Sequence, residues 1–280
     1  MRPRTLLILA VAIIFLIAGF FYWLGSYVTS KKLARFKKIV VVEAPKARKA
    51  IAPPSIPKKF KNPKVAIVID DFGYNMNNVD ALLNISEPVT LSILPDLRYS
   101  AEIAGLARLR GREAILHLPL EPHRKDVKEE VDTIKSGMSE KEIVIRLAKA
   151  ISSVPGLSGV SNHMGSKSTE EKDLMTTILK HLKKNNLYFF DSLTSEKSVC
   201  REAASLTGVK YARRDMFLDN TNSVEYIEKQ LLDLEKLAFK RGRAIAICHD
   251  RKNTMIVLAR KMPEMAKGGI KFVSLSNMVR

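Results

Sequence analysis

The chain has 280 residues, of which 47 are Lys or Arg and 29 are Asp or Glu, so its formal net charge is +18. Residues 31–64 hold 12 of these basic residues with Glu43 as the only acid, whereas residues 65–280 hold 33 basic residues against 28 acids. No basic motif interleaved with aromatic residues accompanies this charge, and the sequence therefore argues against a nucleic-acid-binding protein.

The first segment of the chain has the composition of a membrane anchor. Residues 5–28 are almost wholly apolar and carry no charge, and a helix needs roughly 20 such residues to cross a bilayer. A cleaved signal peptide would have a shorter apolar region of about 7–15 residues that ends in small residues. This one ends in aromatic residues at positions 20–23, which suit a membrane interface. We expect residues 1–30 to form a cytoplasmic stub and one uncleaved transmembrane helix.

A basic linker follows the anchor at residues 31–64. It contains five prolines and is expected to be extended and unpacked. Lysines beside a membrane span attract anionic head groups, so inner-membrane lipid is an expected partner. The basic residues between positions 31 and 38 would keep the following domain in the cytoplasm by the positive-inside rule, but large domains translocate in spite of flanking charge. The residues alone therefore leave the orientation open.

Residues 65–280 form one expected domain in which apolar runs alternate with amphipathic stretches. The alternation predicts a parallel α/β sheet. Capping boxes that begin at Ser139 and Ser168 mark two helix starts, and Gly242 marks a helix end. Strands are expected at 65–69, 89–95, 113–116, 159–162, 187–190, 209–212, 244–248 and 270–275. Helices are expected at about 77–83, 101–110, 139–152, 174–184 and 224–240.

Five of the apolar runs end in a side chain that can bind metal or transfer protons. The carboxyl ends of the strands of a (β/α) barrel gather its active site, and no glycine-rich phosphate-binding fingerprint follows any run. We therefore expect a distorted (β/α) barrel of about seven to eight strands, preceded by one transmembrane helix, and an enzyme. The strand-end residues are Asp70 with Asp71, His117, His163, Asp191, and His249 with Asp250.

These residue types indicate how the chemistry is divided. Of two adjacent carboxylates, one can bind a cation while the other acts as a general base. His117 and Glu121 offer one nitrogen and one oxygen ligand of the kind that zinc accepts; alternatively, His117 bonds to the backbone and Glu121 is exposed. His163 offers a further ligand from its own loop.

The remaining histidines and the cysteines receive separate predictions. His249 follows an apolar run directly, and its pKa range suits proton donation to a leaving group, with Asp250 expected to orient its imidazole. His123 and His181 lie among charged residues and are expected at the surface. Cys248 is expected in the core, and its spacing from Cys200 does not require a disulfide.

The order of these motifs resembles the divergent polysaccharide deacetylase branch of the polysaccharide deacetylase (NodB-like) superfamily, over nearly all of residues 65–280. The resemblance implies a distorted barrel and metal-dependent removal of an acetyl group from an N-acetylated sugar. By motif position it implies Asp70 as general base, Asp71 and His117 as metal ligands, and His249 as general acid. The matching segments are Ile69-Asp70-Asp71-Phe72-Gly73, His117-Leu118-Pro119-Leu120-Glu121-Pro122, Asn162-His163-Met164-Gly165-Ser166 and Phe190-Asp191-Ser192.

Two departures from the superfamily pattern leave roles to be filled. The superfamily has a second His where Glu121 stands, so the third metal ligand is Glu121 or His163, and Pro122 beside Glu121 favours His163. The Arg-Pro-Pro segment that positions the base is absent. Asp191 and Arg214, with Asp215 or Asp219, are expected to take over this positioning. We expect the side chains of Glu121, Asp191 and Arg214 to contact the substrate.

The leading functional hypothesis is a membrane-anchored hydrolase that acts on linear amide C–N bonds. Its expected cofactor is a divalent metal, zinc in the first place, and its expected partner is N-acetylated envelope polysaccharide or peptidoglycan. One alternative is a catalytically silent barrel that binds glycan or an envelope protein, and another is a lipid-binding scaffold that acts through residues 31–64. Because the superfamily's substrates lie outside the cytoplasm, the resemblance implies a single-pass protein of a bacterial inner membrane whose domain faces the periplasm or exterior.

Overall fold

The computed structural model describes residues 60–280. The anchor expected at residues 1–30, and most of the linker expected at residues 31–64, lie outside the described residues. Among residues 60–280, no helix is both long and apolar enough to cross a membrane.

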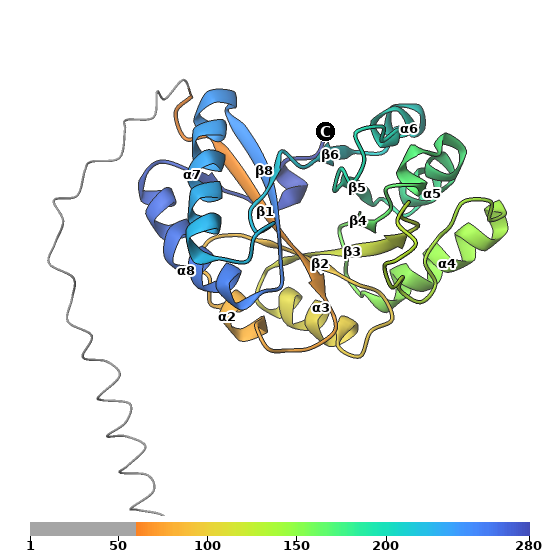
Figure 1. Cartoon of the computed structure of the whole chain (residues 1–280), viewed down its shortest axis with the longest axis horizontal. Coiled ribbons are helices and arrows are strands. Elements are labelled where there is room, and N and C mark those ends of the chain that lie inside the picture. Colours follow the sequence, from red (N-terminus) through yellow and green to blue (C-terminus); the bar gives the residue numbers. More distant parts are fainter. Residues whose placement is uncertain (1–59) are drawn as a thin grey trace, which may run out of the picture. The chain divides into compact units, whose positions relative to one another are not determined.

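Strands and helices alternate along the described part of the chain (Figure 1). The strands are β1 (Lys64–Phe72), β2 (Thr90–Ile93), β3 (Glu113–Leu120), β4 (Gly159–Met164), β5 (Tyr188–Asp191), β6 (Tyr211–Arg213), β7 (Met216–Phe217), β8 (Arg243–His249) and β9 (Lys271–Phe272). The α-helices are α2 (Val79–Leu83), α3 (Ser100–Leu109), α4 (Glu140–Ser153), α5 (Lys172–Lys184), α6 (Cys200–Thr207), α7 (Val224–Arg241) and α8 (Lys252–Lys267). Two short 3₁₀ helices, η1 (Ser168–Glu170) and η2 (Leu275–Asn277), complete the order.

All the strands pair in parallel within one sheet. The path runs β6-β5-β4-β3-β2-β1-β8-β7, and β9 pairs with the start of β1. Strands β6 and β7 end the path and do not pair with each other among the described residues, so the sheet curls without closing. In Figure 1, α2, α7 and α8 lie on one side of the strands and α4, α5 and α6 on the other. The parallel α/β sheet of the barrel type is confirmed, as an incompletely closed barrel.

The hydrophobic core consists of two clusters, one on each face of the sheet. One buried cluster combines strand residues such as Ile67 and Ile69 with helix residues. The other contains only strand residues and the C-terminal segment, and therefore marks the inner face; Ala66 and Val68 belong to it. Because successive strand side chains point to opposite faces, Asp70 continues the inner row of β1. His117 follows Ile115 and His249 follows Ile245 and Ile247 in the same register.

Two of the three helix-end signals read from the sequence lie at helix ends in the structure. Ser139 forms both halves of the expected capping box at α4, and Gly242 ends α7 with a left-handed φ of 81°. The capping box expected at Ser168 is wrong, because Ser168 begins a 3₁₀ turn and α5 starts at Lys172 without a side-chain cap. The hydroxyl of Ser168 instead donates to the carbonyl of Ile134.

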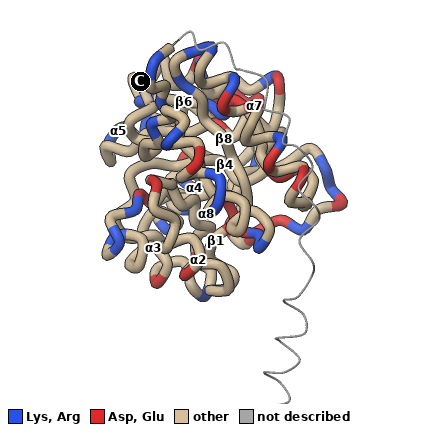
Figure 2. The backbone as a smooth tube through the Cα atoms, turned by 90° about the vertical axis from the view of Figure 1, so that its left-hand side faces the viewer, with Lys and Arg blue, Asp and Glu red and all other residues tan. Residues whose placement is uncertain are grey.

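Basic and acidic residues are interspersed on the domain. In the view of Figure 2, Lys and Arg alternate with Asp and Glu over the helices and loops. The larger part of the basic excess therefore lies before β1, as the sequence indicates.

Candidate metal and catalytic site

A bulge at the end of β1 brings two adjacent carboxylates to one point. The pairing of β1 with β2 shifts register between Ile69 and Phe72, and Asp71 has a left-handed φ of 70°. In a regular strand, Asp70 and Asp71 would point to opposite faces, and a bulge removes this constraint. Asp70 Oδ2 and Asp71 Oδ1 lie 3.6 and 3.4 Å from the same atom, His117 Nε2. Asp tolerates the left-handed region better than most non-glycine residues.

Three side chains from three strands form a cluster with the geometry of a metal site. Asp71 Oδ1 lies 3.2 Å from His163 Nδ1 and 3.4 Å from His117 Nε2. The three residues each offer one ligand atom, and all these atoms lie within 4.8 Å of one another. Ligand atoms that share a tetrahedral ion at about 2.0–2.1 Å lie about 3.3 Å apart. The two measured separations therefore match a shared cation.

Two serine hydroxyls position the His117 ring at Nδ1, the ring nitrogen away from the carboxylates. His117 Nδ1 lies 2.8 Å from Ser161 Oγ, and Ser161 Oγ lies 2.8 Å from Ser92 Oγ. His117 and Ser161 are opposite each other in the β3–β4 register. A histidine that binds metal donates its other ring N–H to an acceptor, and this arrangement would leave the lone pair of Nε2 facing both carboxylates. Neither serine was expected from the sequence, where the only signal is a small polar residue at an inner position of a strand.

The cluster concentrates buried polar atoms that have no hydrogen-bond partner. In residues 60–280, three of the six such side-chain atoms are Asp70 Oδ1, Asp71 Oδ1 and His163 Nε2. Burial alone would raise the pKa of Asp71, but its contacts with His117 and His163 outweigh burial and lower that pKa. An ionised carboxylate buried without donors is costly, whereas a carboxylate with two imidazoles is a donor set that suits a divalent cation. The residues present therefore fit a metal ion.

Asp70 is poised differently from its neighbour. Asp70 is buried, with 2% of the residue exposed, and burial raises its pKa in spite of the opposing effect of His117. A carboxyl group whose pKa is moved toward neutrality can exchange protons at neutral pH. The site thus pairs one carboxylate held ionised with one suited to proton transfer.

His249, at the end of β8, is opposite Asp70 of the neighbouring strand β1 and is hydrogen-bonded to Asp219. His249 Nδ1 lies 2.8 Å from Asp219 Oδ1, and the His249 backbone N–H donates to Asp219 Oδ2 over 2.8 Å. Burial lowers the pKa of His249, but Asp219 outweighs burial and raises it. The protonated form is therefore favoured, as a general acid requires.

The expectation that Asp250 orients the imidazole of His249 is wrong. Asp250 Oδ1 accepts a hydrogen bond from Asn78 Nδ2 over 2.8 Å instead. Asp219, which the sequence analysis named only as an alternative for positioning the base, has no exposed surface and also accepts from Thr254 Oγ1. It follows the two-residue strand β7, and so short a strand leaves no periodic signal in the sequence.

An aromatic ring lies between His249 and Arg214. The Phe217 ring stacks on His249 with centroids 5.8 Å apart and an interplanar angle of 16°. The Arg214 guanidinium lies 3.8 Å from the Phe217 centroid and donates to the carbonyls of Ser192 and Leu193 over 2.7 and 2.8 Å. The Phe217 ring thus separates Arg214 from His249, and the expected contact of Arg214 with substrate stays a prediction.

Asp191, at the end of β5, lies outside the cluster, although its backbone carbonyl accepts a hydrogen bond from Arg214 N. It is 1% exposed and shares the helix-facing side of β5 with Phe189. Its carboxylate accepts hydrogen bonds from Leu193 N, Ser198 Oγ and Tyr211 Oη. These contacts indicate that Asp191 orders the loop after β5. Its expected contact with substrate stays a prediction.

Glu121 also lies outside the cluster. Its carboxylate accepts from the backbone N–H of Ser136 over 2.9 Å and lies 3.0 Å from Lys167 Nζ. The side chain therefore fastens the loop that leaves β3. Of the two candidates for a third ligand, the structure brings His163, and not Glu121, to Asp71.

The surface histidine and the cysteines lie where the sequence indicates. His123 is exposed and pairs with Glu170 over 3.2 Å. Cys200 and Cys248 are both buried and unpaired by disulfide.

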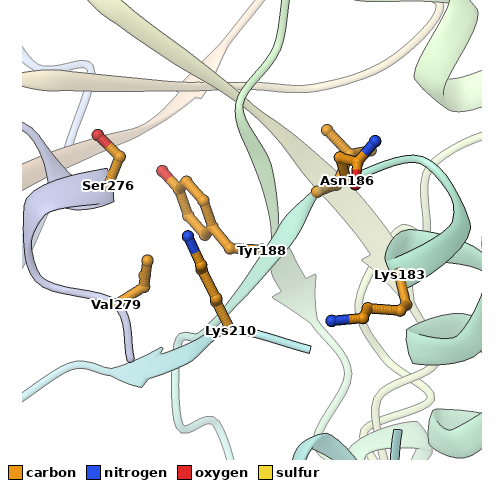
Figure 3. Close-up of a pocket in the computed structure, with 7 residues that line it drawn as sticks. Lys183, Asn186, Tyr188, Lys210, Ser276 and Val279 are labelled. Carbon is orange, nitrogen blue, oxygen red and sulfur yellow. The ribbon is translucent and has the colours of Figure 1, made fainter. Parts of the chain in front are cut away.

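A pocket lies at the amino-terminal ends of the strands, opposite the cluster (Figure 3). It encloses about 220 Å³ and contains none of the residues expected to act chemically. The Tyr188 ring packs directly on Gly159, where a Cβ atom would come within 2.4 Å of the ring. The lining residues are Lys183, Asn186, Leu187, Tyr188, Lys210, Ser276 and Val279.

Residues 67–279 match the family model described as divergent polysaccharide deacetylase. The chain belongs to the divergent polysaccharide deacetylase family. One curated relative is the uncharacterized protein YibQ of Escherichia coli (strain K12), 37% identical over 195 residues that cover 70% of this chain. The match spans about three fifths of the length of YibQ, 61%. Another is an uncharacterized protein of Haemophilus influenzae (strain ATCC 51907 / DSM 11121 / KW20 / Rd), 34% identical over 224 residues, covering 79% of this chain and 78% of that protein.

A solved structure shares the fold described above. The crystal structure of the uncharacterized protein ATU2773 from Agrobacterium tumefaciens C58 matches with a TM-score of 0.75 and 24% sequence identity. The match covers 79% of this chain and 91% of that one. The resemblance to this family expected from the sequence motifs is therefore confirmed, together with its fold.

Proposed function

We propose that this protein is a metal-dependent hydrolase that removes the acetyl group from an N-acetylated sugar of an envelope glycan. The observation that carries the proposal is the cluster of Asp71, His117 and His163 beside a buried carboxylate, Asp70, in a chain of the divergent polysaccharide deacetylase family. The family supports the reaction class, and the site offers a metal-binding donor set, with Asp70 as a base and His249 as an acid.

Asp71, His117 and His163 would hold the metal ion, and zinc suits this donor set. Three protein ligands leave room for substrate or water, as in catalytic zinc sites. When bound, the ion supplies a positive charge that polarises the acetyl carbonyl and favours attack by water.

Two side chains move the protons of the reaction. Water adds to the acetyl carbon, the bond from that carbon to the sugar nitrogen breaks, and the products are acetate and a free amine. Asp70 takes a proton from the attacking water, and His249 gives a proton to the departing nitrogen. Asp219 accepts a hydrogen bond from His249 Nδ1–H, so that Nε2 carries the transferred proton.

The experiment that tests the proposal measures acetate released from N-acetylated glycans by the full chain loaded with zinc. We expect release that stops in Asp70→Asn and continues in His123→Ala, because His123 is exposed and pairs with Glu170. If the metal-loaded protein binds acetylated glycans and releases no acetate, the hydrolase proposal fails and the catalytically silent binding barrel replaces it.

We also propose that residues 5–28 anchor the protein in a bacterial inner membrane, with the domain on the periplasmic or external side. The support is the apolar length of this segment and the location of polymeric envelope glycans outside the cytoplasm. A fusion of a periplasm-dependent reporter enzyme to the C-terminus tests the orientation: activity supports the proposal, and an active cytoplasmic reporter at the same position refutes it.

A further inference from the structure

The end of the sheet opposite the cluster is strongly basic. Charges of both signs are interspersed over the sides of the domain (Figure 2), but the segments that lead into the strands are different. Together these segments hold 13 Lys or Arg residues and 4 Asp or Glu residues, whereas the other described residues hold 22 basic and 24 acidic residues. Seven of the segments run from the last four residues of a helix to the first residue of the next strand, and one precedes β1. They are residues 60–64, 80–90, 106–113, 150–159, 181–188, 204–211, 238–243 and 264–271.

These basic side chains share one end of the molecule and are open to solvent. Parallel strands all begin at the same edge of a sheet, so the eight segments converge there. Of the 13 basic residues, 11 are exposed, and Arg112 and Arg243 are half-buried. We call the 13 basic side chains of these segments the basic face.

Three adjacent strands begin with a basic residue in register. Lys64 of β1 is opposite Arg243 of β8 and Lys271 of β9. The backbone of Arg280 pairs with Tyr211 at the start of β6. Burial lowers the pKa of Arg243, and the positive charge of Arg280 lowers it further. Like charges that face each other destabilise a sheet, so the fold retains at this end a repulsion that a layer of anions would relieve.

The stability of the fold does not account for this concentration of charge. A basic residue in the last turn of a helix is favoured by the helix dipole, which explains residues such as Lys183. No such effect acts on Lys61 and Lys210, which precede strands. Within residues 60–280, Arg241 is the one member of the basic face that pairs with a carboxylate, that of Asp215 over 3.1 Å. The charge is therefore available to an external partner.

We infer that the basic face docks on the surface of a bilayer that contains anionic phospholipid. Negatively charged head groups attract clusters of Lys and Arg, and a face spread over eight segments matches an extended surface better than a small anion. The chain also enters the domain at this face, because residues 60–64 lead into the start of β1. Residues 31–64, which include this entry, hold 12 further or shared basic residues. The pocket lined by Lys183 and Lys210 lies in the same face (Figure 3).

Docking by the basic face gives the domain one orientation on the membrane. The cluster lies at the carboxyl ends of the strands, so it would be directed away from the bilayer and toward polymers of the envelope. The inference goes beyond the proposed hydrolase function and holds for any reaction at the cluster. It rests on the proposed membrane anchor only to bring the domain to a bilayer.

The test uses the full chain in two kinds of lipid nanodisc, one of phosphatidylcholine alone and one of an equimolar mixture with phosphatidylglycerol. Mass spectrometry measures the rate at which an amine-acetylating reagent modifies each lysine. Lys64, Lys210 and Lys271 should react about threefold more slowly in the anionic discs, and high salt should remove this difference. Lys125 and Lys128, which are exposed in the loop after β3, should react equally in both discs.

Two double variants with the same change in net charge separate the face from the charge. Lys210→Glu with Lys271→Glu should bring the rates at Lys64 in the two discs close to each other. Lys125→Glu with Lys128→Glu, at the opposite end, is the matched control and should leave the difference of about threefold at Lys64. Unchanged thermal unfolding of both variants shows that the fold is intact.

The outcomes distinguish the basic face from the other proposals. Equal rates at Lys64 in the two discs refute docking, and equal slowing at both ends of the sheet refutes a preferred face. If the full chain does not enter the discs, the proposed anchor fails, and sedimentation of the same chain with vesicles of the two compositions decides. Binding to the anionic vesicles alone, lost in Lys210→Glu with Lys271→Glu, supports the face, and no binding refutes it. Acetate release enters none of these measurements, so the hydrolase proposal stands or fails separately.

Discussion

Polar side chains at the two ends of the parallel sheet differ in whether they have hydrogen-bond partners. At the amino-terminal end, Glu113 accepts from Thr90 Oγ1 over 2.8 Å and from the backbone of Ser276 over 3.2 Å. Arg112 at that end donates to the carbonyl of Glu87 over 2.6 Å. At the carboxyl-terminal end, Asp70 and Asp71 each leave a buried oxygen without a donor.

Polar groups at the amino end of the sheet stabilise the fold, and those at the carboxyl end are free for chemistry. Polar groups at the amino end connect the C-terminal segment and the loops to the sheet, and their hydrogen bonds stabilise the fold. Tyr188 Oη and Arg112 Nε at that end also lack a partner, but they are single atoms beside packed or otherwise bonded groups. Only the carboxyl end gathers unpaired atoms of several side chains around one point, as expected for the active end of a barrel.

The largest contrast should come from one carboxyl-to-amide change at each end. Asp70→Asn should lower acetate release about 10³-fold, because the base is lost, with little change in unfolding. Glu113→Gln should keep release within about twofold and lower the free energy of unfolding by about 1 kcal/mol, because its bonds to Thr90 and Ser276 weaken. Steady-state rates and denaturant unfolding of both variants check this. Equal losses of activity in Asp70→Asn and Glu113→Gln would contradict the assignment of catalysis to the carboxyl end of the sheet alone.

A change at Asp219 should move the pH profile at the carboxyl end. Because Asp219 raises the pKa of His249, Asp219→Asn should lower that pKa. A general acid acts in its protonated form, so the alkaline decline of kcat should shift to lower pH, and kcat at neutral pH should fall about 10²-fold. Rates measured from pH 5 to 9 check the shift. A smaller kcat with an unmoved alkaline limb would mean that His249 is not the acid or that Asp219 does not set its pKa.

A small change at the amino end should affect stability alone. Gly159→Ala would place a Cβ atom 2.4 Å from the Tyr188 ring, and overpacking of this kind costs about 1–3 kcal/mol. Gly105→Ala in α3 is the control, because nothing lies within 4 Å of its Cβ position and alanine favours a helix. It should stabilise by about 0.5–1 kcal/mol. Activity per folded molecule should be unchanged in both, and a loss of activity in Gly159→Ala would couple the two ends.

The sequence predicted those features that a short apolar run marks. Apolar runs revealed eight of the strands, and the residue that ends each inner row was visible as Asp70, His117 or His249. Asp191 was visible too, but its register with Phe189 places it on the helix-facing side of β5. A count of alternate positions along that run would have separated it from the others.

The remaining features depend on contacts between distant parts of the chain. The bulge at Asp71 results from pairing with β2, and no local pattern announces it. The choice of His163 over Glu121 follows from where the loop after β3 turns, which Lys167 and Ser136 help to determine. Asp219 reaches His249 from an irregular segment 30 residues away.

The most direct test of the account is the metal content of the purified full chain by elemental analysis after dialysis against zinc. The account predicts near one ion per chain, retained in His123→Ala and Glu121→Gln and lost in Asp71→Ala, His117→Ala and His163→Ala. Equal metal content in all the variants, or loss in Glu121→Gln with retention in His163→Ala, would contradict the assignment of the metal site.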